Sequence, residues 1–293
     1  MNVLVTGATG FVGRSLVPAL CAAGHTVTSM TRQPSSYEPP DGVSVVSGDL
    51  LEPDSLEGAF SNIDVAYYLV HSLDTGRAFA KRDRRAADNF VHAANAADVE
   101  RVIYLGGLGE TGSDLSEHLR SRREVETILR EGTYALTTLR AAIIIGKGSA
   151  SFTMISQLAQ KLPIMVTPKW VRTECQPIAI QDVIEYLVGV LDVPESAGET
   201  FEIGGPEVLT YEDALRRTAR HYRKQPLIIP VPVLSPGLSV YWVDLVTDVP
   251  RSIAHPLIYG LKNPVVVNDD RIHELVPITL TSFDDAIERA LGS

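Results

Sequence analysis

The stretch Val3–Gly13, which reads VLVTGATGFVG, decides the fold of this chain. Its aliphatic start predicts a strand, and the apolar residues that recur at helical spacing after it predict a helix over Phe11–Ala23. Between them, Gly7 permits a tight turn, Gly10 lets the backbone approach a pyrophosphate, and Gly13 lets the helix pack closely on the strand. Because a helix N-terminus presents N–H groups and partial positive charge to phosphates, this arrangement predicts a dinucleotide-binding βαβ unit.

The end of the second expected strand bears on which dinucleotide binds. An NAD site usually carries an acidic residue about 20 residues beyond the glycines, where it accepts hydrogen bonds from the ribose. Here the strand ends in Met30-Thr31-Arg32, and a guanidinium pairs with a 2′-phosphate that a carboxylate would repel. We therefore predict NADP(H), with NADPH favoured over NADH; the alternative is that Arg32 is an ordinary exposed loop residue. The loop residues expected to contact the cofactor are Gly7, Thr9, Gly10, Phe11, Val12 and Gly13.

Further cofactor contacts are expected after the later strands. Asp49, followed by Leu50, is placed to accept a hydrogen bond from the adenine amino group, and a turn-forming role for Asp49 is an equal alternative. Leu69, His71 and Gly106 follow or end strands whose carboxyl ends border the expected crevice. His71 is a candidate for contact with the ribose or with a substrate.

Alternating strand and helix patterns predict the fold class, an α/β doubly wound parallel sheet (Rossmann) with a smaller interleaved C-terminal substrate region. Residues 1–148 are expected to form the dinucleotide-binding domain, to which 174–205 returns, while 149–293 mainly forms the substrate-binding region. The expected strands are Val3–Thr6, His25–Met30, Val43–Ser47, Ile63–Val70, Arg101–Leu105, one within Ala135–Ile145, Gln176–Ile180 and Thr200–Ile203. The later expected helices are Arg77–Ala97, Leu115–Arg130, Gln181–Leu191, one from Thr210 to Tyr222 and one from Ser282 to Leu291.

Several segments give the chain a family resemblance. The glycine loop and Gly48-Asp49-Leu50 resemble the short-chain dehydrogenase/reductase superfamily, in its extended or atypical form. More narrowly, the segments His118–Arg122, Arg140–Gly146 and Trp170–Thr173 resemble YbjT-like NAD(P)H-binding proteins, which are also similar to NAD-dependent epimerases and dehydratases. The resemblance covers nearly the whole chain and implies a Rossmann fold that holds a nicotinamide cofactor.

The resemblance also implies a chemistry whose usual residues are missing. Enzymes of the superfamily use a Tyr and a Lys one helical turn apart, where the Lys lowers the Tyr pKa so that the phenol exchanges a proton with the substrate. His118 and Arg122 stand in the place of this pair, and Gly106-Gly107-Leu108 stands where a Ser is usual. His118 and Arg122 are therefore the candidate catalytic residues, with an ordinary charged helix surface as the alternative. No metal site is predicted, since the histidines and cysteines lack ligand spacing.

Composition limits the partners and the location. The chain has 26 basic and 36 acidic residues, a net charge of −10, so nucleic-acid binding is not expected. Two cysteines and a start that enters a strand at once predict a cytoplasmic protein. We expect a small-molecule substrate as the partner and no transmembrane segment; peripheral contact with a membrane or a protein complex stays a secondary alternative. Residues 226–243 carry no charge and predict a buried strand and a pocket-lining helix.

These expectations converge on one function with two alternatives. The first is an NADP(H)-binding oxidoreductase that reduces a small apolar carbonyl or quinone-like compound. The second is a non-catalytic NADP(H)-binding sensor, assembly factor or subunit of a complex, which the missing Tyr and Lys favour. A nucleotide-sugar epimerase is a weaker third interpretation, because those enzymes also rely on the Tyr.

Overall fold

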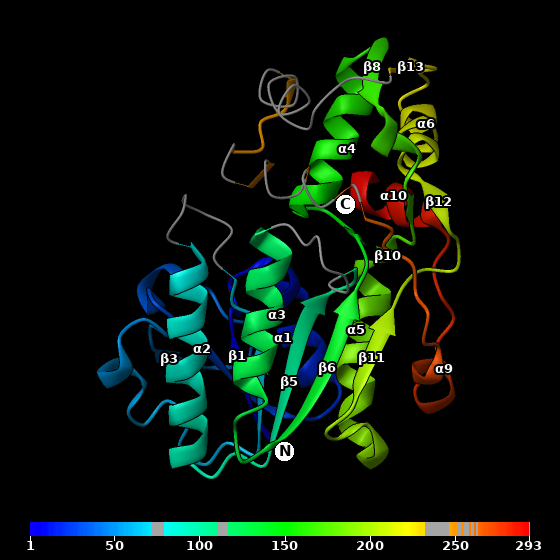
Figure 1. Cartoon of the computed structure of the whole chain (residues 1–293). Helices are drawn as coiled ribbons and strands as arrows, with labels where there is room; N and C mark the ends of the chain where they lie inside the picture. Colours follow the sequence, from blue (N-terminus) through cyan, green and yellow to red (C-terminus); the bar gives the residue numbers. More distant parts are fainter. Residues whose placement is uncertain are drawn as a thin grey trace.

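A parallel sheet of seven strands forms the centre of the computed structural model, which describes residues 1–71, 79–109, 117–231, 246–250, 253–254, 258, 261 and 263–292. The strands are β1 (Asn2–Thr6), β2 (Thr26–Thr31), β3 (Ser44–Ser47), β4 (Val65–Tyr68), β5 (Arg101–Gly107), β6 (Ala135–Ala141) and β11 (Thr200–Ile203). Their order is β11-β6-β5-β4-β1-β2-β3 (Figure 1), so the chain builds outward from β1 in one direction and then from β4 in the other. Ligands of such sheets bind in the crevice at the carboxyl ends of the strands where this order reverses.

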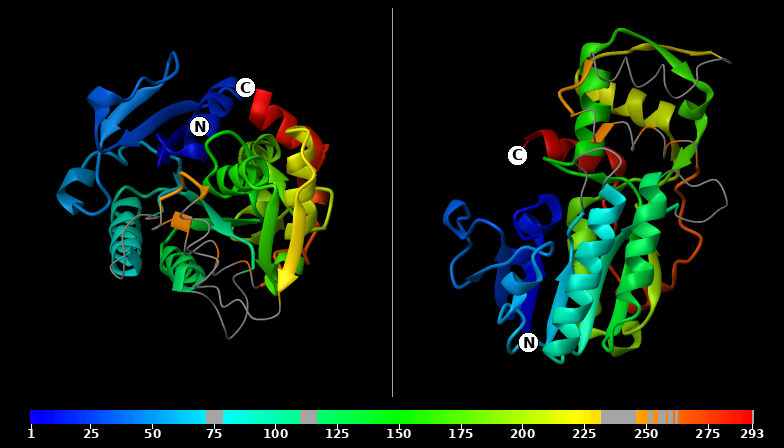
Figure 2. Two further views of the ribbon diagram at one scale, coloured as in Figure 1. Left: turned by 90° about the horizontal axis from the view of Figure 1, so that it is seen from above. Right: turned by 60° about the vertical axis from the view of Figure 1, so that its left-hand side comes forward.

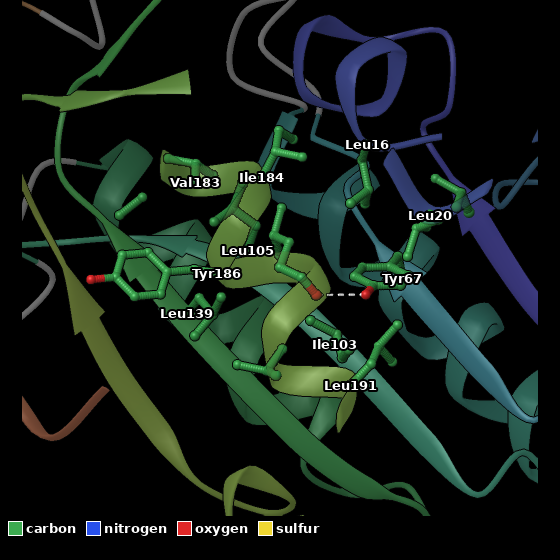
Figure 3. Close-up of a cluster of buried hydrophobic side chains, with 14 of the residues drawn as sticks. Leu16, Leu20, Tyr67, Ile103, Leu105, Leu139, Val183, Ile184, Tyr186 and Leu191 are labelled. Carbon is green, nitrogen blue, oxygen red and sulfur yellow. Dashed lines mark hydrogen bonds between the residues drawn. The ribbon is translucent and has the colours of Figure 1, made fainter. Parts of the chain in front are cut away.

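Helices cover both faces of the sheet (Figure 2), as expected for a doubly wound fold. α1 (Phe11–Ala22) and α5 (Ile180–Gly189) share one face, and α2 (Phe79–Ala96) and α3 (Glu117–Leu129) share the other. Because side chains of a strand point alternately to its two faces, β4 serves both cores. Val65 and Tyr67 pack among α1 and α5 residues, as Figure 3 shows for Tyr67, whereas Ala66 and Tyr68 pack among those of α2 and α3.

Most of the C-terminal region lies beyond the carboxyl ends of the sheet strands (Figures 1 and 2), whereas its short helix at Arg271–Leu275 lies beside β11. It contains the helices α4 (Ala150–Lys161), α6 (Tyr211–His221), α9 (Arg271–Leu275) and α10 (Phe283–Gly292). Its short strands pair as β7 (Ile144–Ile145) with β10 (Ile178–Ala179), β8 (Ile164–Pro168) with β13 (Leu227–Val231), and β9 (Glu174–Cys175) with β12 (Leu209–Thr210). Short 3₁₀ segments occupy Pro34–Ser36, Pro53–Leu56, Lys169–Arg172, Val190–Asp192 and Pro194–Ser196.

Local sequence signals explain where the helices begin and end. Gly24, just beyond α1, has φ +87°, the left-handed conformation that terminates a helix most readily at glycine. The capping box before α6 is formed in full, because Thr210 Oγ1 accepts from the Asp213 N–H and the Asp213 carboxylate accepts from the Thr210 N–H, both at 3.1 Å. These polar residues satisfy N–H groups that the first helical turn leaves unbonded.

The fold class is as predicted, while several expected elements are shorter. The region Ala135–Ile145 is divided into β6 and β7 because the chain pairs with β11 up to Ala141, opposite Ile203, and then pairs with β10 from Ile144. Among the described helices, none has the length and apolarity to cross a membrane. Of the charge-free stretch, residues 232–243 lie outside the described residues, and the division into two domains stays a prediction.

Candidate functional site

A cavity of about 550 Å³ extends from the glycine loop into the C-terminal region. At its sheet end it is lined by Gly7, Gly10, Phe11, Val12, Gly13, Leu69, His71, Arg122 and residues 105–108 and 141–144. At its other end it is lined by residues 148–151, Met154, Ile155, Leu158, Tyr211, Leu215, Ile253, Ile258, Leu261 and Val265. Residues that follow β1, β4, β5 and β6 thus meet at one cavity, where the strand order reverses.

The glycine loop has the shape of a phosphate cradle. Gly7 has φ +75°, and a Cβ there would lie 3.0 Å from the backbone of Leu69. A Cβ on Gly13 would lie 2.3 Å from the carbonyl oxygen of Gly7, so the loop and α1 touch only because both positions lack side chains. Gly10 has no side chain to cap α1, which leaves the first N–H groups of the helix for an anion. The loop therefore fits the pyrophosphate of a dinucleotide.

A buried polar cluster borders the cavity on the α2 and α3 side. The Nδ1 of His71 lies 3.3 Å from Oδ2 of Asp83, and Ser121 Oγ donates to the same Oδ2 at 3.2 Å. The Asp83 side chain is 4% exposed and that of His71 15%. Burial and then the nearby Arg122 charge lower the pKa of His71, and the bond to Asp83 opposes this shift. The surroundings of His71 therefore favour its neutral imidazole over the protonated form.

Arg122 joins this cluster to the central sheet. Its Nη2 donates to the carbonyl of Leu105 at 3.1 Å, and the Tyr104 hydroxyl donates to the Arg122 carbonyl at 3.4 Å. Arg122 thereby brings a positive charge to the cavity wall beside the end of β5. The other candidate catalytic residue, His118, belongs to α3, but its side chain lies outside the described residues.

The C-terminal half of the cavity is mainly apolar. Met154, Ile155 and Leu158 face it from α4, and Leu215 faces it from α6. Pockets of this kind bind apolar ligands and orient them through a few polar groups. His71 and Arg122 supply polar groups at the sheet end. The cavity can therefore hold an apolar compound next to a bound dinucleotide.

Not all sequence-predicted cofactor residues line this cavity. Those that do not are Thr9, Arg32, Asp49 and Leu50. Asp49 Oδ1 accepts from the N–H of Leu51 at 2.9 Å, as the turn-forming alternative requires, and Leu50 is buried. Arg32 is exposed at the end of β2. The binding roles of all these residues stay predictions.

Asp83 and Ser121 are the site residues that sequence reasoning missed. Asp83 lies within the run Lys81-Arg82-Asp83-Arg84-Arg85, which resembles a solvated helix surface. The sequence feature that could have indicated its burial is its spacing, because Asp83 shares the helix face of Ala86, Ala87 and Phe90. The four cations around it are exposed. Among the described residues, no His, Cys, Asp and Glu side chains gather in groups of three that could hold a metal ion.

Comparisons with known proteins identify a family and several relatives. A family model described as NAD(P)H-binding matches residues 7–155. A relative from Arabidopsis thaliana, NADH dehydrogenase (ubiquinone) 1 alpha subcomplex subunit 9, is 26% identical over 97% of this chain and 71% of its own length. The photosystem II assembly factor Ycf39 of Synechocystis is 26% identical over 70% of this chain and 63% of its own length. A ceramide reductase of Caulobacter vibrioides is 26% identical over 88% of this chain and 81% of its own length.

A solved structure gives the same fold. A nucleoside-diphosphate-sugar epimerase from Staphylococcus aureus superposes with a TM-score of 0.81 at 15% identity, over 98% of this chain and 100% of the other. At this identity the likeness concerns the fold alone, and it confirms the doubly wound sheet with its C-terminal region.

The relatives correct the partner prediction. From the sequence, we expect a small-molecule substrate as the main partner and contact with a protein complex only as a secondary alternative. That ranking is wrong, because relatives that match most of this chain are named as a subunit of one complex and an assembly factor of another.

Proposed function

This chain belongs to the NAD(P)H-binding family of atypical short-chain dehydrogenases/reductases, and on that premise we propose that it is an NADP(H)-dependent oxidoreductase. Its proposed substrate is a small apolar compound with a carbonyl or quinone group. The observation that carries the proposal is the single cavity that joins the glycine loop to an apolar chamber. The name of the Caulobacter relative, a ceramide reductase, supports an apolar substrate.

Different residues of this chain would bind the pyrophosphate, the 2′-phosphate and the substrate. The glycine loop and the N-terminus of α1 would hold the pyrophosphate, and Arg32 would pair with the 2′-phosphate. Bound NADPH supplies the hydride. Met154, Ile155 and Leu158 would exclude water from the substrate.

The test joins a cofactor titration to a turnover assay. Quenching of protein fluorescence is followed on addition of NADPH and of NADH, and then NADPH oxidation is recorded with menadione as an apolar quinone probe. We expect tighter binding of NADPH and saturable oxidation. Equal or tighter binding of NADH contradicts the role of Arg32, and absence of oxidation contradicts the oxidoreductase proposal.

A second candidate function is that of an NADP(H)-binding component of a protein complex. The names of the Arabidopsis and Synechocystis relatives favour it, as does the absence of Tyr and Lys from the sequence of α3. We propose that the protein lies in the cytoplasm. If it is a component of a complex, a tagged chain purified at low salt from its own cells should elute with a defined set of protein partners. Elution as the free chain, together with menadione turnover, favours the oxidoreductase.

A further inference from the structure

We infer that the small sheet of β8 and β13 is a docking surface for a membrane whose lipids carry negative charge. The two strands lie at the end of the molecule opposite the N-terminus (Figures 1 and 2). Four apolar side chains, each 41–56% exposed, form the surface that we call the apolar face: Ile164, Val166, Leu227 and Ile229. Among the described residues, the other exposed large apolar side chains are those of Met1, Val208 and Leu291. The inference goes beyond the proposed oxidoreductase function and does not depend on it.

The register of the two strands explains why these four side chains share one face. β8 and β13 are parallel, with Leu227 opposite Ile164, and successive side chains of each strand point to opposite faces. The alternate residues Met165 and Ile228 are therefore turned inward, so β13, which the charge-free sequence predicts to be buried, is buried on one side only. This inner side packs in one cluster with residues that line the apolar end of the cavity, namely Ile155, Tyr211 and Leu215.

Basic residues gather where the two parallel strands begin. Lys161 shortly precedes β8, Arg223 and Lys224 shortly precede β13, and all three are exposed. Lys224 Nζ donates to the carbonyl of Gln160, which brings it beside the end of α4 and thus beside Lys161. Asp248 lies 3.5 Å from Lys161 and offsets one of these charges. A positively charged group of side chains therefore adjoins the apolar face.

The charge and the size of this surface favour a lipid membrane over a protein partner. Residues 132–173 and 214–243, which include both strands, contain no Asp or Glu, although the chain has a net charge of −10. Anionic lipids attract such a region and repel the acidic remainder, and the apolar side chains can then enter the boundary below the headgroups. The apolar face presents roughly 400 Å², about half of the ~800 Å² that each partner buries in a stable protein interface. Its side chains are all aliphatic, whereas protein interfaces draw most of their binding energy from Trp, Tyr and Arg.

The experiment measures sedimentation of the full chain with vesicles of phosphatidylcholine alone and of an equal mixture of phosphatidylcholine and phosphatidylglycerol. We expect binding to the mixed vesicles that weakens in high salt, and little binding to phosphatidylcholine alone. The double change Val166→Thr with Ile229→Thr keeps β-branched side chains in the strands but makes the face polar, so it should weaken binding about 10-fold or more. Val208→Thr with Leu291→Thr, at two exposed apolar residues outside this face, is the matched control.

A second pair of variants tests the basic residues. Each Lys or Arg near an anionic membrane surface is worth about 5-fold in affinity, so Arg223→Gln with Lys224→Gln should weaken binding to the mixed vesicles about 25-fold. Lys81→Gln with Arg85→Gln removes the same charge from two exposed positions of α2 and should bind like the native chain. Equal losses in the two double variants would show that net charge, and not this surface, governs binding, and would overturn the inference.

The remaining outcomes decide what covers the apolar face. Absence of native binding to the mixed vesicles overturns the inference, and so does full binding by the double threonine variant. A native dimer in sedimentation velocity that this variant dissociates, without any vesicle binding, would assign the face to a second copy of the chain instead. Urea denaturation midpoints equal to that of the native chain would show that the variants are folded. Vesicle binding needs no turnover, so failure of this inference leaves the oxidoreductase proposal standing.

Discussion

The carbonyl oxygen of Gly7 lies 2.3 Å from the point that a Cβ on Gly13 would occupy. Gly13→Ala must therefore push α1 away from the loop that would hold the pyrophosphate. We expect loss of NADPH binding in a fluorescence titration, with a decrease of about 1–3 kcal/mol in the free energy of unfolding. Gly292→Ala is the matched control, because a Cβ at Gly292 meets no atom within 4 Å. Full NADPH affinity in Gly13→Ala would show that the loop does not carry the cofactor.

Arg32 decides the preference for NADP(H) in this proposal. Removing one charged hydrogen-bonding partner typically costs about 1.5–3 kcal/mol, so Arg32→Ala should weaken NADPH binding about 10- to 100-fold. Binding of NADH, which has no 2′-phosphate, should not change. Arg220→Ala, which alters an exposed arginine of α6, is the control. Equal losses of affinity for NADPH and NADH would show that Arg32 does not recognise the 2′-phosphate.

Much of the sheet could be predicted because its signals are local. The strand at Thr200–Ile203 has the predicted bounds, and the capping box at Thr210 and Asp213 is formed, since each depends on residues close together in the chain. The glycine loop is similarly encoded by the spacing of Gly7 and Gly13. Bounds are less predictable where tertiary contacts decide them, as after Ala141, where the chain leaves its pairing with β11 and pairs with β10 instead.

The polar cluster of the site could not be predicted in the same way. His71, Asp83 and Ser121 belong to the loop after β4, to α2 and to α3, so only the packing of two helices on the sheet brings them together. The sequence pattern placed Asp83 within a basic run, where exposure is the usual outcome. His71 could be predicted as a site residue because it directly follows an apolar strand pattern in the sequence.

Tyr67 links the centre of the sheet to α5. Its hydroxyl is fully buried and donates to the carbonyl of Leu187 at 2.7 Å (Figure 3). Tyr67→Phe leaves that carbonyl without this donor, so we expect the free energy of unfolding to fall by about 1–3 kcal/mol in urea denaturation. Tyr134→Phe, at a buried tyrosine whose hydroxyl has no hydrogen-bond partner among the described residues, should not lower it. Equal effects of the two changes would contradict a structural role for the Tyr67–Leu187 bond.

The lowered pKa of His71 predicts a pH dependence of stability. The folded protein favours the neutral imidazole, so the unfolded chain binds a proton more readily. The free energy of unfolding should therefore fall as the pH falls through the ordinary histidine pKa of about 6.5. Urea denaturation at about pH 7.5 and about pH 5.5 should show a smaller loss for His71→Gln than for the native chain. A loss that is the same in both proteins, or smaller in the native one, would contradict the lowered pKa.

Leu158 tests whether the apolar chamber holds the substrate. It faces the cavity from α4, at the end away from the glycine loop. Leu158→Trp would fill part of the chamber, so we expect KM for menadione to rise or turnover to fall while NADPH affinity stays the same. Leu158→Met conserves the volume and should leave both unchanged. Turnover that the tryptophan does not affect would place the substrate elsewhere, and a parallel loss of NADPH binding would indicate that the change disturbs the fold rather than the chamber.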